Sequence, residues 1–170
     1  MANILDLFAS RWYWLALALG GVGLLAVALF YQYQLGEEPC QVCIHARIWV
    51  IGFTLVALLM CFLPVKRWLY GVANLLVIAC AIGLGERSWY LYLIENGRGD
   101  GSCEFQLGLP DWFALDRWFP DLFEVRNLCT YTPEMLFGLS MAESLLLAAA
   151  AIIAVAVLSL YATRRAGAAS

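Results

Sequence analysis

Two cysteines separated by two residues form the most reactive motif of this chain. Cys40 and Cys43 stand in the run Pro-Cys-Gln-Val-Cys, and this spacing is typical of a redox-active dithiol or of half a metal site. Cys43 falls near the predicted start of an apolar helix, where the helix dipole favours a thiolate. Arg47 follows one turn later on the same helical face. Its guanidinium could stabilise that thiolate or extend to the membrane interface.

A second pair, Cys103 and Cys129, is separated by 26 positions in a long polar segment. The remaining two cysteines, Cys61 and Cys80, fall inside apolar stretches. A free cysteine there behaves as a small hydrophobic residue, so we assign these two no chemical role. Four thiols in two pairs could pass oxidation from one pair to the other through mixed disulfides.

The composition places these cysteines in a membrane protein. Hydrophobic residues make up 64% of the 170 residues and charged residues 14%, whereas soluble domains average roughly 45–50% and 25%. The net charge is −3 and there is no basic cluster, so we expect no nucleic-acid partner. We predict a single integral domain over 1–170, in contact with the lipid bilayer.

Four stretches approach the roughly 20 apolar residues that a membrane-spanning helix needs. They cover about 12–31, 44–63, 68–87 and 141–161. The predicted fold is therefore an all-α membrane protein, a bundle of four transmembrane helices. Two loops, about 32–43 and 90–140, then share one side of the membrane and hold four of the six cysteines. The run from Pro110 to Pro120 is rich in aromatic residues and reads as a short amphipathic segment in the interface, or else as a loop packed on the bundle.

The charges orient the bundle. Twelve of the 13 acids lie on the side of the two loops. The short loops and helix ends on the other side are basic, which predicts that both termini are cytoplasmic. The residues on that basic side, against Asp6 alone, are Arg11, Lys66, Arg67, Arg164 and Arg165.

A relay in such a protein needs a donor and an acceptor. Electrons could enter at the loop pair from a soluble partner and leave to a molecule dissolved in the bilayer, for which a quinone is the natural candidate. The chain has no Gly-rich dinucleotide motif, and its single histidine excludes haem held by two histidines. That residue, His45, could donate a proton or hydrogen bond to the quinone, or be an ordinary interfacial polar residue.

Two further interpretations remain open. Four thiols could hold zinc on a membrane scaffold, although the spacing of the second pair and an oxidising compartment disfavour this, and we predict no metal. Alternatively, two disulfides could simply staple the outer loops.

The motifs resemble the bacterial disulfide bond formation protein B family, DsbB. The resemblance covers nearly the whole chain, including Pro39-Cys-Gln-Val-Cys-Ile-His-Ala-Arg47 at the head of the second span and the loop from Cys103 through Leu-Pro-Asp-Trp to Cys129. The vitamin K epoxide reductase family also has two cysteine pairs on four helices, but its loop pair comes before its C-x-x-C.

The resemblance implies a quinone-dependent protein-thiol oxidase of the bacterial inner membrane, with its redox loops in the periplasm. It would reoxidise a periplasmic DsbA-like thiol oxidase and reduce ubiquinone or menaquinone from the membrane pool. Reduced DsbA would attack Cys103, and Cys129 would then exchange with Cys40. Cys43 and Arg47 would meet the quinone. Met141, at the start of the fourth span, matches a residue beside it.

Overall fold

Four long helices make up the bundle in the computed structural model, which describes residues 8, 10–63, 66–98, 107–127, 129 and 138–168. Each helix contains a stretch long and apolar enough to cross a membrane. The prediction of an all-α bundle with four membrane-spanning helices is thus confirmed, and the described residues form no strand. The four are α2 (Arg11–Gln34), α3 (Gln41–Phe62), α4 (Arg67–Glu95) and α7 (Met141–Ala168).

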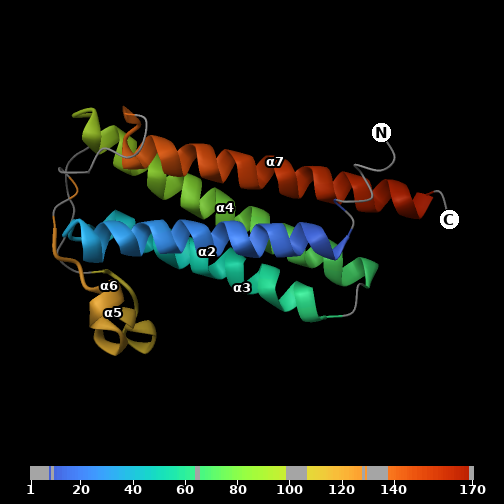
Figure 1. The fold of residues 1–170 in the computed structure, drawn as a ribbon, viewed down its shortest axis with the longest axis horizontal. Coiled ribbons are helices and arrows are strands. Elements are labelled where there is room, and N and C mark those ends of the chain that lie inside the picture. Colours follow the sequence, from blue (N-terminus) through green and yellow to red (C-terminus); the bar gives the residue numbers. More distant parts are fainter. Residues whose placement is uncertain are drawn as a thin grey trace.

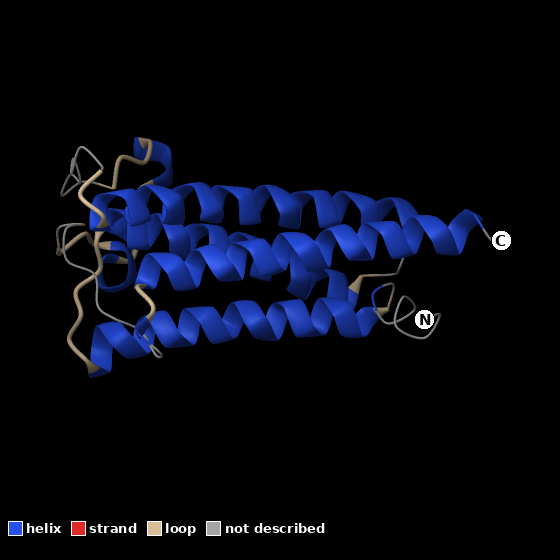
Figure 2. Ribbon diagram, turned by 90° about the horizontal axis from the view of Figure 1, so that it is seen from above, coloured by secondary structure: helices blue, strands red, loops and turns tan. Residues whose placement is uncertain are grey.

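Successive helices run in opposite directions (Figure 1). The main packing contacts join α2 to α3, α3 to α4 and α4 to α7. One end of the bundle, here called the thiol end, is where α3 and α7 begin and α2 and α4 finish (Figures 1 and 2). At the opposite end α2 begins and α7 finishes. The α2–α3 and α4–α7 connections, which carry or adjoin the four predicted redox cysteines, therefore start and finish at the thiol end, whereas α3 leads into α4 at the opposite end.

Three helices extend beyond the predicted spans at the thiol end, and the first of them, α2, continues to Gln34. Helix α3 begins at Gln41 because Cys40 caps its N-terminus. Helix α4 continues to Glu95, since Glu86 and Arg87 lie on its surface and do not interrupt the backbone hydrogen bonds. It ends where Gly97 adopts a positive φ of 66°, a conformation that glycine accepts without strain.

The opposite end holds a buried polar cluster, here called the Asn74 cluster, made of Tyr13, Tyr70, Asn74 and Ser159. The Tyr13 hydroxyl donates to Asn74 Oδ1 at 2.8 Å. The Asn74 amide donates to the Tyr70 carbonyl at 3.0 Å and to Ser159 Oγ at 3.4 Å. Ser159 Oγ in turn donates to the Phe8 carbonyl at 2.9 Å. These bonds join α2, α4 and α7 to the segment that precedes α2.

Three short helical turns follow one another in the predicted amphipathic segment: η1 (Asp111–Phe113), α5 (Leu115–Trp118) and α6 (Pro120–Phe123). Trp112, Trp118 and Phe119 are exposed, whereas Ala114 and Phe123 are buried. Phe123 packs with Ile44 of α3 in a small apolar cluster. The segment therefore is amphipathic: one side anchors it to the bundle and the other presents aromatic rings outward, as an interfacial segment would.

Candidate functional site

The C-x-x-C motif lies at the N-terminus of α3. Cys40 is the N-cap, and its Sγ accepts a hydrogen bond from the Cys43 backbone N–H at 3.3 Å. Both side chains are free thiols and both are buried, with 2% and 7% of their surface exposed. A sulfur in the place of the usual N-cap oxygen satisfies one of the unpaired N–H groups of the first turn. The helix start thus holds the two sulfurs together.

The hydrogen bonds of this pair converge on Cys40. The Cys43 side chain donates to Cys40 and lowers the pKa of the Cys40 thiol below its ordinary value, with further help from backbone N–H groups and against the effect of burial. The sequence places the thiolate on Cys43, whereas the structure stabilises negative charge on Cys40 while both thiols are free. Once Cys40 enters a disulfide, Cys43 no longer has this acceptor.

A loop segment is paired with the residues that precede the motif. The N–H groups of Arg126 and Asn127 donate to the Pro39 carbonyl at 3.1 and 3.3 Å, and Asn127 forms an isolated parallel bridge with Cys40. Two residues further on, Cys129 is 1% exposed. The backbone therefore guides the loop cysteine toward the motif.

Cys129 packs in one apolar cluster with Cys40 and Cys43. It is disulfide-bonded. Cys103, the other loop cysteine named from the sequence, lies outside the described residues. Three of the four predicted redox cysteines thus share one buried site, and the described His, Cys, Asp and Glu side chains form no group of three that could hold a metal ion.

Arg47 lies one turn below Cys43 and is 7% exposed. Its Nη1 donates to Gln32 Oε1 at 2.6 Å and to the Leu122 carbonyl at 3.2 Å. Its Nη2 donates to the Ala28 carbonyl at 3.5 Å. All three acceptors are neutral, and the buried Nε has no partner. A buried charge is costly unless it is paired, so this guanidinium retains the capacity to bind an electron-rich group.

Two small cavities meet beside Cys43 and Arg47. One, about 20 Å³, is lined by both residues and by Met141. The other, about 70 Å³, extends toward Ser144 and Leu145 of α7. Both are also lined by Ala28 and Tyr31 of α2 and by Met141. The predicted site residues Cys43, Arg47 and Met141 therefore converge from α3 and α7.

His45 is not part of this convergence. It lines a different cavity, together with Trp49 of α3, Arg87 of α4 and Leu107. Neither cavity beside Cys43 includes it. An α-helix turns by about 100° per residue, so His45, two positions after Cys43, projects from another side of α3.

Gln32 is a residue of the site that the sequence does not reveal. It accepts from Arg47, and its own Nε2 donates to the Asp121 carbonyl at 2.9 Å. The adjacent Tyr33 hydroxyl donates to the same carbonyl at 3.0 Å. A polar residue at the end of an apolar span is ordinary. Only the docking of α6 (Pro120–Phe123) against α2 identifies Gln32 as the link between the arginine and the loop.

These features define a class of protein: a helical membrane bundle with a buried dithiol beside a disulfide-bonded cysteine and a partly unpaired arginine. Residues 10–159 match the family model described as "Disulfide bond formation protein DsbB". The chain belongs to the DsbB family.

Curated relatives agree with this assignment. The chain is 35% identical over 144 residues to disulfide bond formation protein B 2 of Pseudomonas aeruginosa, which covers 84% of this chain and 85% of the relative. It is 32% identical over 148 residues to the protein B of Shewanella loihica, with 82% of each covered. For the protein B of Haemophilus influenzae the identity is 30% over 145 residues, with 84% and 82% covered. The family is therefore that of the disulfide bond formation proteins. The four apolar helices of this chain fit a multi-pass membrane protein.

Proposed function

We propose that this protein is a quinone-dependent protein-thiol oxidase, which reoxidises a DsbA-like periplasmic partner and passes the electrons to ubiquinone or menaquinone. The observation that carries the proposal is the packing of Cys129, a disulfide-bonded loop cysteine, against the free thiols of Cys40 and Cys43. Exchange between two cysteine pairs requires such contact, and a disulfide that only staples a loop does not.

The exchange begins at the loop. A thiolate of the reduced partner attacks Cys103, a mixed disulfide forms, and Cys129 leaves as a thiolate. Cys129 then attacks Cys40 in the Cys40–Cys43 disulfide, and Cys43 leaves with the electron pair. The second thiol of the partner releases Cys103, which attacks Cys129 and frees Cys40. The partner has then lost two electrons and two protons, and the C-x-x-C pair has gained them.

The observed thiol states support this order. Cys40 and Cys43 are free while Cys129 is in a disulfide, the pattern expected after the exchange and before reoxidation. In the mixed Cys40–Cys129 disulfide, Cys43 would lose the hydrogen-bond acceptor described above. Arg47, which lines the same cavity, would then be the cation that stabilises the Cys43 thiolate.

The residues beside Cys43 suit a quinone. When bound, a quinone supplies a two-electron acceptor that also takes up two protons, which are those of the dithiol. Arg47 would hold a quinone oxygen, because its buried Nε is an unpartnered donor. Met141 and Tyr31 line both cavities and would orient the ring by apolar contact.

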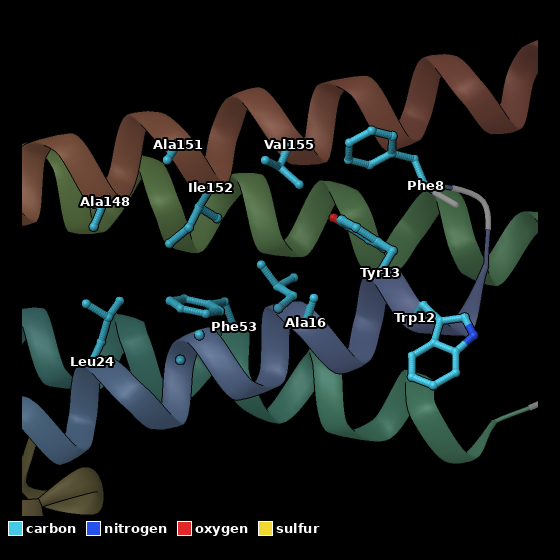
Figure 3. A pocket seen from close by; sticks show the side chains of 13 residues that line it. Phe8, Trp12, Tyr13, Ala16, Leu24, Phe53, Ala148, Ala151, Ile152 and Val155 are labelled. Carbon is cyan, nitrogen blue, oxygen red and sulfur yellow. The ribbon is translucent and has the colours of Figure 1, made fainter. Parts of the chain in front are cut away.

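A long apolar cavity supports a lipid-soluble acceptor. It occupies about 710 Å³ between α2 and α7, where side chains of the two helices face each other across the gap (Figure 3). Leu24 lines both this cavity and the one that reaches Met141. A hydrocarbon tail attached to a ring near Cys43 would fit along this path. His45, on another side of α3, is left outside the proposed quinone site.

The proposed location is the bacterial inner membrane, with the thiol end periplasmic and both termini cytoplasmic. The positive-inside pattern supports it, because the short connection and the helix ends opposite the cysteines hold five of the ten basic residues, and short loops and helix ends are the segments that set orientation. An oxidising periplasm also suits a disulfide at Cys129.

The test uses the full-length purified protein with a reduced DsbA-like protein as donor and ubiquinone as acceptor. We expect one quinone to be reduced for each disulfide formed in the donor. The loss of quinone absorbance measures this reduction. Cys43→Ser should abolish the reaction, whereas Cys61→Ser, a matched change inside α3, should retain it. Donor oxidation without quinone reduction would contradict the proposal.

A further inference from the structure

A further cavity, with polar and apolar lining residues, lies on another side of α3 from Cys43. Its volume is about 510 Å³, and the proposed thiol chemistry uses none of its residues. Residues of α3, one residue of α4 and the loop segment 107–109 line it. It is lined by Gln41, His45, Ile48, Trp49, Arg87, Leu107, Gly108 and Leu109.

The floor of this cavity is set by a close helix contact. Trp49 lies against α4 at Gly83, where an added Cβ would come within 2.5 Å of the indole Cε2. His45 is one turn before Trp49, and Arg87 is one turn after Gly83. Because α3 and α4 are antiparallel (Figure 1), the imidazole and the guanidinium stand at about the same height above the indole.

His45 offers an unused acceptor. Its Nδ1 is buried and has no partner, and Leu107 lines the cavity beside it. In neutral histidine one ring nitrogen donates and the other accepts, so the unpartnered Nδ1 has the capacity to accept a hydrogen bond. A buried polar atom without a partner is costly, and a ligand with an N–H or O–H group would remove this cost.

Arg87 offers a cation at the same level. It is only 40% exposed, and it pairs loosely with Glu86 through Nε at 3.5 Å. The cavity therefore combines a positive group, a neutral acceptor and a nearby carboxylate with an apolar floor of Trp49 and Ile48. A molecule with an anionic group, a protonated amine and a hydrocarbon part complements all of these features.

The position in the helices identifies the source of such a molecule. His45 is in the second turn of α3, and Arg87 is about two turns before the end of α4. The predicted spans 44–63 and 68–87 begin and end at this level, and a bilayer changes from headgroups to hydrocarbon at the ends of a span, where tryptophan is enriched. Trp49, 37% exposed, marks the same boundary.

We propose that this cavity binds a phospholipid whose headgroup carries a phosphate and a primary ammonium. The phosphate pairs with Arg87, an ammonium N–H donates to His45 Nδ1, and the acyl chains lie over Trp49 and Ile48. This lipid site is independent of the proposed quinone site, since the two stand on different sides of α3.

The test compares phosphatidylethanolamine with phosphatidylcholine of identical acyl chains, which carries the same charges but no N–H donor. Native mass spectrometry of the full-length protein in detergent counts the lipids retained. We expect phosphatidylethanolamine to bind about fivefold more tightly, the effect of one net hydrogen bond. His45→Phe should remove this preference, and Arg87→Gln should weaken both lipids. Arg98→Gln, an exposed arginine outside the cavity, is the matched control.

Three results would overturn the assignment. One is equal binding of the two lipids by the unaltered protein, and another is unchanged binding after Arg87→Gln. The third concerns the source of the ligand. If soluble glycerophosphoethanolamine displaces bound phosphatidylethanolamine as well as added phosphatidylethanolamine does, the site binds a soluble phosphoethanolamine compound and not a membrane lipid. Unfolding temperatures measured without added lipid show whether each variant still folds.

Discussion

The two ends of the bundle bury polar groups in opposite ways. At the end where α2 begins, the Asn74 cluster consists of neutral side chains that satisfy one another and the backbone. At the thiol end, Arg47 is a charge whose bonds go to Gln32 and to two carbonyls. Its Nε is unpartnered, whereas no side-chain atom of the Asn74 cluster is among the buried unpartnered groups.

This difference assigns the two ends different roles: the Asn74 cluster stabilises the fold, and Arg47 is available to a ligand. A neutral, satisfied cluster gains from every bond it makes and leaves nothing for a ligand. A buried cation with neutral partners keeps part of its field available and is expensive to maintain. Mutations in the Asn74 cluster are therefore expected to change the stability of the fold, whereas mutation of Arg47 is expected to change turnover.

The largest expected effect is on the thiol end alone. Cys43→Ser should lower quinone reduction at least about a thousandfold, as for the loss of other reacting nucleophiles. The unfolding temperature should hardly change, because serine has nearly the volume of cysteine. Turnover with a reduced DsbA-like donor and thermal unfolding of the same sample measure the two effects. An active Cys43→Ser protein would remove the sulfur from the reaction.

Arg47→Gln should lower quinone turnover by about a hundredfold, the effect of losing one preorganised electrostatic group. The apparent affinity for quinone should fall more than the affinity for the thiol donor. Steady-state kinetics with each substrate varied in turn measures the split. Arg126→Gln is the control, because that arginine pairs with Glu124 on the surface and such pairs contribute little. Equal losses for both substrates would make Arg47 a general structural residue.

The opposite end should behave in the reverse manner. Asn74→Ala leaves the Tyr13 hydroxyl and Ser159 without their shared partner, and should lower the free energy of unfolding by about 1–3 kcal/mol. Quinone turnover below the unfolding transition should be unchanged. Denaturation in detergent, followed by activity, checks both statements. A loss of turnover without a loss of stability would break the proposed division between the two ends.

The smallest effect concerns the pH dependence of Cys40. Its pKa is lowered by the Cys43 hydrogen bond, so its thiolate should persist below the pH at which an ordinary thiol is protonated. This stabilises the folded reduced state above the unfolded thiol pKa, and the gain is lost as the pH falls through the folded pKa. Thiolate absorbance, compared with that of Cys40→Ser, follows the titration. Cys43→Ala should raise the midpoint.

The sequence predicts the fold well because each long helix is apolar over its whole span. It also makes Arg47 a candidate, because a cation inside a span is costly and needs a reason. Other features depend on tertiary contacts. His45 lies between Cys43 and Arg47 in the sequence, yet the turn of the helix directs its side chain into another cavity. Gln32 gains its place only when α6 docks on α2. The proximity of Cys129 to Cys40 rests on backbone bonds to Pro39, which no spacing of cysteines encodes.

The bonds to Pro39 are the backbone pairing that joins the Cys129 end of the loop to the motif, beside the packing of Cys129 itself. A single carbonyl accepts both N–H groups, and proline has no N–H of its own to extend the pairing. A contact of this size opens locally at far lower free energy than the helices it rests on. The segment carrying Cys129 can thus leave and return many times while the bundle stays folded. The rate at which the two sulfur pairs meet is then governed by a local equilibrium of the loop, independent of the stability of the membrane helices.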